Sequence, residues 1–235
     1  TAGTLYAVAP PVPVHPNLLT FLHVVPGRTL IGGSLAAVGA ALGWLARILE
    51  LPPNEVLALA AQSDAGADGL LFLPYLSGEL QPINDGHARG VFVGLTGSSE
   101  RRHLARAVLE GTAFALAHNL AVLSEAGVAT NVLHATGGPT RSPLWCQLIA
   151  DATGRTLHVS EDNAGAPFGN ALLAGAGVGL IGDVELVATR AARVTRTFAP
   201  QPELRRRYDG LFSVYRSLYP NLKGAFAGLA ALEGA

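Results

Sequence analysis

Apolar positions recur along the chain with two different periods, and these periods predict two kinds of element. Short runs rich in β-branched or aromatic residues, bounded by Gly, Pro or polar clusters, are typical of strands. Such runs occupy residues 4–8, 21–25, 29–32, 70–75, 91–93, 131–135 and 156–160. The run at 70–75 is continuously apolar, which favours a strand buried on both faces.

The segments between these runs show helical spacing, with apolar residues three or four positions apart. Predicted helices occupy residues 35–49, 54–62 and 99–126, a close-packed helix of small residues covers 168–177, and a further helical face covers 204–218. The residues after Gly224 are expected to form a terminal helix or a frayed tail. One more helix has marked ends, because Ser142 is a typical N-cap, Pro143 suits the first helical position and Gly154 follows the last turn.

The alternation of strands and helices indicates an α/β layer structure. No internal repeat or linker divides the sequence, so we expect a single domain over residues 1–235. Nearly half of the residues are apolar and 14% are charged, which is enough for a core and argues against disorder.

The charge balance narrows the classes of partner. Sixteen basic and seventeen acidic residues give a net charge of -1, so no overall basic field is present to hold nucleic acid or an anionic membrane. No run of about eighteen uncharged apolar residues predicts a membrane span. The single cysteine, Cys146, cannot form an internal disulfide and suits a packed thiol in a reducing cytoplasm. We therefore expect small-molecule partners.

The chain begins abruptly. It contains no methionine, and Thr1-Ala2-Gly3-Thr4 runs directly into the first predicted strand. The basic-then-apolar order of a signal peptide is missing. The lack of methionine and the abrupt start of the strand indicate a fragment whose preceding part is absent.

Two glycine-containing segments are candidates for ligand binding. The small residues at 1–4 would let backbone N–H groups approach a phosphate, although an ordinary hairpin turn can contain the same residues. Residues 135–138 lead from a predicted strand through Pro139 to the helix that begins at Ser142. A strand, a glycine turn and a helix N-terminus offer free N–H groups and a flat surface for a base or ribose. An ordinary strand-to-helix turn explains the second segment equally well.

A longer pattern lies between these two segments. It runs Gly90-x-Phe92-x-Gly94-Leu95, then seven residues, then His103-Leu104-x-x-Ala107-Val108-Leu109-Glu110. This pattern resembles the second signature of the FGGY carbohydrate kinases. Residues 73–79, 88–90 and 137–145 are similar to neighbouring family segments in the same order. The resemblance covers nearly the whole chain, is firmest from 70 to 177, and looks closest to xylulokinase-like members.

The resemblance implies the C-terminal domain of a two-domain sugar kinase with the actin-like ATPase (ribonuclease H-like) fold. In this family ATP lies between the domains, and the sugar is held mostly by the N-terminal domain. The resemblance assigns seven positions to the nucleotide: Thr1 and Gly3 at the phosphates, Gly39 and Gly43 at its border, and Gly137, Gly138 and Ser142 at the adenosine end.

The resemblance assigns no catalytic residue to this chain. The family's general base is an aspartate in a Gly-Asp-Gln or Gly-Asp-Asn sequence shortly before the phosphate turn, and nothing here precedes Thr1. The whole enzyme is expected to transfer the γ-phosphoryl group of ATP, with Mg²⁺, to a sugar hydroxyl. Xylulose is the first expectation, with gluconate, ribulose and glycerol as alternatives. The chain alone is expected to be inactive, and a homodimer is the candidate assembly.

Two departures from the family pattern keep other functions open. Pro139 replaces a third glycine and lacks an N–H, so one backbone donor is missing. Leu80 follows Glu79 where many members have arginine. Pro139 is the hint of a degenerate domain that binds nothing, and a non-catalytic actin-like nucleotide-binding module is a separate alternative.

The remaining polar residues are expected to have structural roles. Glu79, Asp85 and Glu110 lack the paired spacing of acid–base or metal carboxylates, which favours capping or salt bridges. The histidines show no metal-ligand spacing with Cys146, so the sequence predicts no metal site. The run 205–207 is three adjacent arginines, whose side chains diverge on a helix and suit a solvated face.

Overall fold

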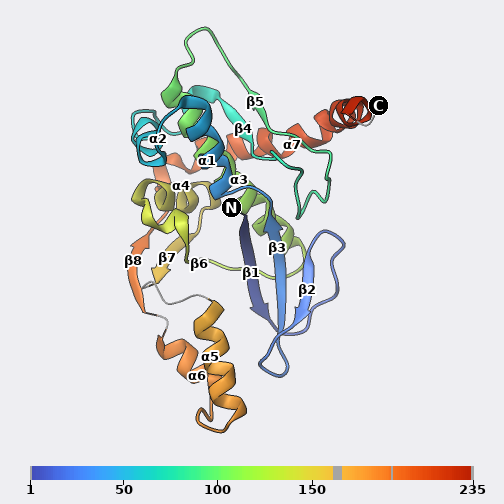
Figure 1. Ribbon diagram of the computed structural model, residues 1–235, viewed down its shortest axis with the longest axis vertical. Coiled ribbons are helices and arrows are strands. Elements are labelled where there is room, and N and C mark those ends of the chain that lie inside the picture. The colour runs from blue at the N-terminus through green and yellow to red at the C-terminus, as the bar shows by residue number, and fades with distance from the viewer. Residues whose placement is uncertain (1, 161–165, 192, 234–235) are drawn as a thin grey trace.

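The computed structural model describes residues 2–160, 166–191 and 193–233 (Figure 1). The strands are β1 (Gly3–Ala9), β2 (Leu19–Leu22), β3 (Thr29–Leu35), β4 (Leu71–Leu73), β5 (Val91–Val93), β6 (Val132–Ala135), β7 (Thr156–Ser160) and β8 (Val194–Phe198). The α-helices are α1 (Gly39–Leu49), α2 (Pro53–Ala60), α3 (Arg101–Glu125), α4 (Pro143–Thr153), α5 (Ala166–Gly177), α6 (Val184–Ala191) and α7 (Pro202–Glu233). Two short 3₁₀ helices are η1 (Ala67–Gly69) and η2 (Gly138–Arg141). The predicted α/β class is confirmed.

The described strands form three small sheets. β3 pairs antiparallel with β1 on one side and β2 on the other, and β4 pairs antiparallel with β5. In the third sheet β6 and β7 are parallel, while β8 runs antiparallel to β7. Figure 1 shows the β1–β3–β2 sheet and the β6–β7–β8 sheet below a layer of helices that includes α1 to α4. The glycine segments identified in the sequence therefore belong to two different sheets.

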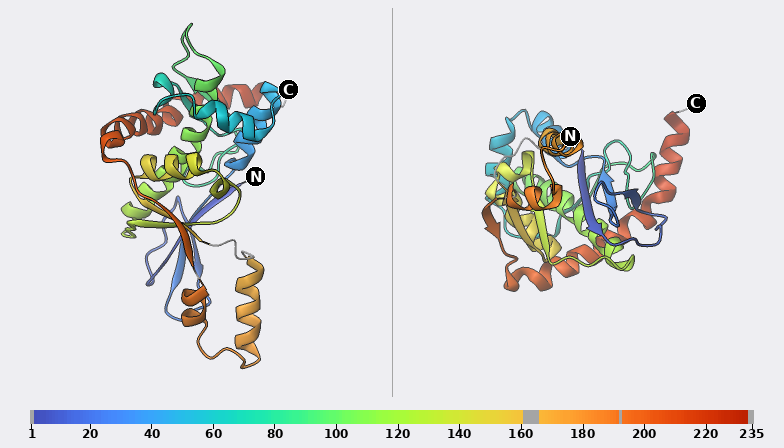
Figure 2. Two further views of the ribbon diagram at one scale, coloured as in Figure 1. Left: turned by 90° about the vertical axis from the view of Figure 1, so that its left-hand side faces the viewer. Right: turned by 90° about the horizontal axis from the view of Figure 1, so that it is seen from below.

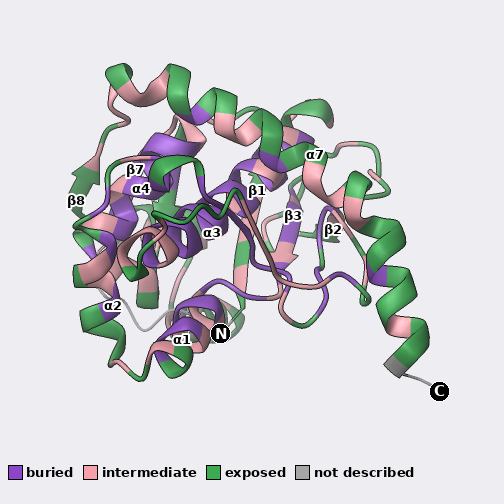
Figure 3. Ribbon diagram, turned by 90° about the horizontal axis from the view of Figure 1, so that it is seen from above, coloured by how far each residue is buried: buried purple, intermediate pink, exposed green. Residues whose placement is uncertain are grey.

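The long helix α3 is the centre of the core. It packs against α1, α2, α4 and β4, and buried residues gather along it and α4 in Figure 3. Its length and hydropathy would suit a membrane span, but 78% of its most apolar window is buried inside the domain. Gly111 allows the closest approach, because a Cβ there would lie 2.3 Å from the backbone oxygen of Phe72 in β4. We therefore assign α3 as a core helix.

A charged cluster is buried on the same helix. Arg106 Nε donates a hydrogen bond of 2.7 Å to Glu110 Oε1, one helical turn away. The same oxygen accepts from the Tyr208 hydroxyl of α7 at 2.8 Å and from the backbone N–H of Gly66 at 2.9 Å. Arg106 also donates to the backbone oxygen of Ser63 at 3.2 Å. The cluster joins α3, α7 and the segment before η1, and confirms the salt-bridge role expected for Glu110.

The structure corrects two predicted helices. The helix expected over 35–49 begins at Gly39, because Leu35 pairs with Gly3 and is still part of β3. The helix expected over 168–177 forms as α5 but is not close-packed. Most of its residues are exposed, and only Leu172 is buried among those described. Figures 1 and 2 show α5 and α6 extending away from the helical layer.

Other differences concern lengths and missed elements. The predicted strand at 70–75 is shorter, since β4 ends at Leu73. The residues after Gly224 continue α7, which runs through Pro220 and buries Phe226. Helix α6 and strand β8 were not predicted from the sequence. The predicted helix that Ser142 caps is confirmed, because its hydroxyl accepts from the N–H of Trp145 at 3.2 Å.

Replacement of Glu110 by alanine tests the buried cluster. Glu110→Ala leaves the charge of Arg106 buried without its carboxylate, so we expect a loss of about 3–5 kcal/mol in the free energy of unfolding. Glu125→Ala is the matched control, because Glu125 pairs with Arg216 on the surface. Its loss in the free energy of unfolding should be less than about 1 kcal/mol. Urea unfolding followed by circular dichroism measures both. Equal losses would contradict the assignment.

Candidate functional site

The first candidate segment lies where β1 begins and α1 starts. A Cβ at Gly3 would lie 2.5 Å from Val38 Cγ2, so a side chain at this position would require Val38 to shift. Val38 is the N-cap of α1 and supplies no side-chain acceptor to the first turn. The N-terminus of a helix with uncapped N–H groups attracts anions. The structure thus brings Gly3 next to the helix end that starts with Gly39.

The surface of α1 beside this point is open. Gly43 lies one turn after Gly39, and a Cβ built there would meet no atom within 4 Å. A flat ligand can therefore lie against this part of the helix. Thr1, the other residue predicted to contact phosphate, lies outside the described residues.

The second candidate segment is the turn between β6 and α4. Gly137 has φ 92° and ψ −167°, a conformation that side chains rarely adopt, so a glycine is required there. A Cβ at Gly138 would meet nothing within 4 Å, which leaves a flat and exposed surface. The Thr140 hydroxyl donates to the backbone oxygen of Gly137 at 2.6 Å and closes the turn. Pro139 is accommodated inside η2.

The core holds this turn in place. The hydroxyl of Ser142 accepts from Trp145, and the indole Nε1 of Trp145 donates to Thr112 Oγ1 of α3 at 3.0 Å. Ser142 is 9% exposed, so its hydroxyl serves first as a helix cap. Since α1 also packs against α3, the same helix supports both candidate segments.

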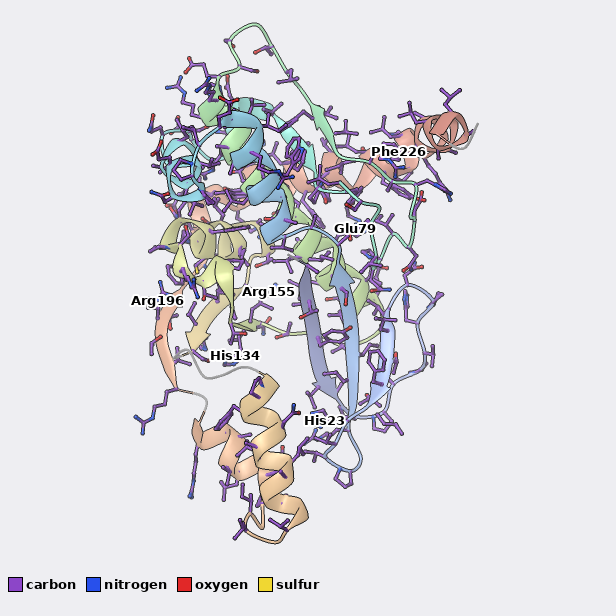
Figure 4. The ribbon with its side chains drawn as sticks, in the orientation of Figure 1. His23, Glu79, His134, Arg155, Arg196 and Phe226 are labelled. Atoms are coloured by element: carbon purple, nitrogen blue, oxygen red, sulfur yellow. The ribbon has the colours of Figure 1, made fainter. Side chains whose placement is uncertain are left out.

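A pocket of about 250 Å³ lies beside the second segment, at the ends of β6 and β7 and against β8. It is lined by Thr136, Gly137, Thr140, Arg141, Val159, Ser160, Thr195 and Arg196. Of the predicted nucleotide residues that the structure describes, Gly137 alone lines it. Figure 4 shows Arg196 on β8 at this side of the domain, and its guanidinium donates to the backbone oxygen of Thr140. Arg196 therefore helps to hold the turn.

Arg196 was not predicted as a site residue, because the strand that carries it, β8, was not predicted. The alternation Val194-Thr195-Arg196-Thr197-Phe198 is the strand signal that was available. Behind the turn, burial raises the pKa of the Cys146 thiol, and the nearby Arg196 acts in the opposite direction. Cys146 is buried and free, as expected for a packed thiol.

Metal-binding groups and titrating histidines are the remaining candidates for chemistry. The described part of the chain holds no group of three or more His, Cys, Asp or Glu side chains that could bind a metal ion. Burial and the charge of Arg216 lower the pKa of His118 to about 4, so this histidine is neutral near pH 7 and packs against Phe212. The packing of His118 against Phe212 agrees with the structural role expected for this histidine.

A buried glutamate lies close to the first segment. Glu79 is 4% exposed, and its Oε1 accepts from the N–H of Ala36 at 2.7 Å and from that of Leu80 at 2.8 Å. Burial raises the pKa of Glu79 to about 7, although these two hydrogen bonds act in the opposite direction. Ala36 lies between β3 and α1, so Glu79 caps the junction that leads to Gly39.

Comparisons with known proteins support the resemblance noted in the sequence. The model for the C-terminal domain of the FGGY family of carbohydrate kinases matches residues 4–178. A xylulose kinase of Staphylococcus epidermidis is 34% identical over 92% of this chain and 44% of its own length. A glycerol kinase of Citrifermentans bemidjiense is 38% identical over 82% of this chain and 39% of its own length. The chain thus spans less than half the length of these relatives.

Solved structures show the same coverage. The crystal structure of xylulose kinase from Rhodospirillum rubrum superposes with a TM-score of 0.87 at 36% identity. The superposition covers 96% of this chain and 46% of that protein. The expected fold, that of the C-terminal domain of actin-like sugar kinases, is therefore confirmed.

Alanine at two glycines tests the packing of the first segment. Gly3→Ala forces Val38 to move, so we expect a loss of about 1–3 kcal/mol in the free energy of unfolding. Gly43→Ala places a methyl group in open space within a helix, which should stabilise the protein by up to about 1 kcal/mol. Urea unfolding of both variants measures the sign of each change in the free energy of unfolding. A loss for Gly43→Ala, or none for Gly3→Ala, would contradict this geometry.

Replacement of Glu79 by glutamine tests its protonation. The pKa in the folded state, about 7, exceeds the ordinary 4.5, so this group favours folding fully below pH 4.5 and loses that contribution as pH rises through 7. Relative to Glu79→Gln, the wild-type chain should lose about 3 kcal/mol of stability between pH 4.5 and pH 8. Urea unfolding at several pH values measures the difference. Glu55→Gln, at an exposed position, should give parallel profiles.

Proposed function

The chain belongs to the FGGY family of carbohydrate kinases, and on that premise we propose that it is the nucleotide-binding part of an ATP-dependent sugar kinase. The observation that carries the proposal is the pair of glycine segments supported by α3. One is Gly3 beside the uncapped start of α1, and the other is the open turn at Gly137–Gly138. The first segment offers backbone N–H groups for the phosphates, and the second offers an open surface for the adenosine.

The chemistry of the two segments suits ATP. In this proposal the phosphates lie near Thr1 and Gly3, toward the positive end of the α1 dipole. Gly39 and Gly43 border the nucleotide along the open face of α1. At the adenosine end, Gly137, Gly138 and Ser142 form the second wall, where a planar base can lie on a surface without a Cβ atom.

The proposed reaction is transfer of the γ-phosphoryl group. A sugar hydroxyl oxygen forms a bond to the γ-phosphorus, the bond to the β–γ bridging oxygen breaks, and ADP leaves while a base takes the hydroxyl proton. The printed sequence contains no Gly-Asp-Gln or Gly-Asp-Asn, so we assign no base to it. Magnesium would enter with the phosphates and neutralise their charge. This chain's own contribution is to bind and orient the nucleotide.

Xylulose is the proposed acceptor. The xylulose kinase of Staphylococcus epidermidis aligns with 92% of this chain, and that of Rhodospirillum rubrum aligns with 96%. The glycerol kinase relative at 38% identity keeps glycerol as the second candidate, and gluconate and ribulose remain family alternatives. A cytoplasmic location and a homodimer are part of the same proposal. A non-catalytic nucleotide-binding module is the competing function.

ATP binding by the chain tests the proposal. Isothermal titration with ATP and Mg²⁺ should give a saturable heat for the wild type. Gly138→Trp should weaken binding at least about tenfold. Its side chain would occupy the adenosine wall, whereas a Cβ at this position disturbs no neighbouring atom.

Gly210→Trp is the matched control, because Gly210 is exposed on α7 and its Cβ also meets no atom within 4 Å. It should bind ATP as the wild type does. Absence of any heat with wild type would favour a degenerate domain. Xylulose-dependent ADP release by this chain alone, in a coupled assay, would contradict the absence of a catalytic base.

A further inference from the structure

The loop between β4 and β5 docks on the junction between β3 and α1. Glu79 Oε1 accepts from the backbone N–H of Ala36. Two residues later, Gln81 N donates to the backbone oxygen of Ser34 at 3.1 Å, and Gln81 Oε1 accepts from Ser34 N at 3.0 Å. The loop therefore binds three backbone groups within residues 34–36. Because β3 ends at Leu35, these contacts determine where the chain leaves the sheet and turns into α1.

The far side of the loop is held by two helices. Asn119 Nδ2 of α3 donates to the backbone oxygen of Gln81 at 2.9 Å. The Tyr219 hydroxyl of α7 donates to Asp85 Oδ2 at 2.8 Å. Asp85 in turn exchanges backbone hydrogen bonds with Glu79, at 2.9 and 3.0 Å. The loop is thus a rigid support between the core and the junction at residues 34–36, and Figure 4 shows Glu79 beside the end of β3.

A buried glutamate at position 79 lowers the stability of the fold if its contacts are purely structural. Its Oε2 has no hydrogen-bond partner among the described residues, and no basic side chain contributes to the shift of its pKa. The titratable groups that interact with it electrostatically are the hydroxyls of Tyr75 and, from α7, Tyr215. An unpaired buried carboxylate destabilises a fold, and an amide could accept the same N–H groups. This cost indicates a role for the carboxylate beyond folding.

We propose that Glu79 is a positioning residue for the nucleotide, acting through the backbone N–H of Ala36 on the start of α1. The inference rests on the proposed function, because Gly39 and Gly43 border the nucleotide only in that assignment. Glu79 itself does not touch the ligand. An ionised carboxylate holds an N–H more strongly than a neutral acid or an amide does. The carboxylate form therefore fixes the helix start most tightly, at the end that faces the phosphates.

Two substitutions separate this role from a structural one. Glu79→Ala removes the acceptor of the Ala36 N–H, and Glu79→Gln keeps a neutral acceptor. At pH 8, Glu79→Ala should weaken ATP binding about tenfold, and Glu79→Gln should be intermediate. At pH 6, where the wild-type carboxyl is largely protonated, the wild type and Glu79→Gln should agree within about twofold. Titration calorimetry measures the ratio of affinities at each pH, which cancels the titration of ATP itself.

The exposed Glu55→Gln is the control and should follow the wild type at both pH values. Hydrogen exchange of the Ala36 amide gives a readout without nucleotide, and Glu79→Ala should lose protection there. Wild-type affinity in Glu79→Ala at both pH values would overturn the positioning role while leaving the proposed function intact. A wild-type chain that binds no ATP would overturn both. A ratio of wild type to Glu79→Gln that does not change with pH would contradict the role of the ionised form.

Discussion

The whole domain depends on the burial of α3 on nearly every side. A helix in that position cannot expose its polar side chains to water, so each of them needs a partner inside the protein. Glu110 meets this requirement by accepting from Arg106, Tyr208 and the backbone of Gly66 with one oxygen. That cluster connects the centre of the core to α7, which is almost one hundred residues later in the chain.

The same helix carries the end of the family signature and the residues that directly follow it. Gly111, directly after the signature, permits contact with the backbone of β4, and Thr112 receives the indole N–H that anchors α4. α1 packs on another side of α3. The signature residue Glu110 therefore maintains the core and does not reach the candidate ligand surface. The helix that carries the end of the signature thus packs against α1 and α4, the two helices that adjoin the glycine segments.

Local signals predicted the parts of the structure that local forces determine. The ends of α4 follow from Ser142, Pro143 and Gly154, and α3 begins and ends within two residues of its predicted limits. The start of α1 was predicted wrongly, because pairing of Leu35 with Gly3 extends β3 and depends on a contact over 32 residues. The strand that carries Arg196 has an alternating pattern, but the contact of Arg196 with Thr140 was not predictable for the same reason, nor were the partners of Glu79. These roles come from tertiary contacts, which leave no periodic pattern.

The two buried glutamates show how stability and positioning separate in this fold. Glu110 has a guanidinium and a hydroxyl beside it, so its charge is compensated and the cluster holds elements together. Glu79 has only backbone N–H donors, and its charge is not compensated by any described basic group. A carboxylate in the environment of Glu79 is destabilising when ionised, yet it binds its backbone partner most strongly in that state. Selection for stability alone would favour glutamine at this position, so the location of Glu79 behind the start of α1 is best explained by what that helix end must hold.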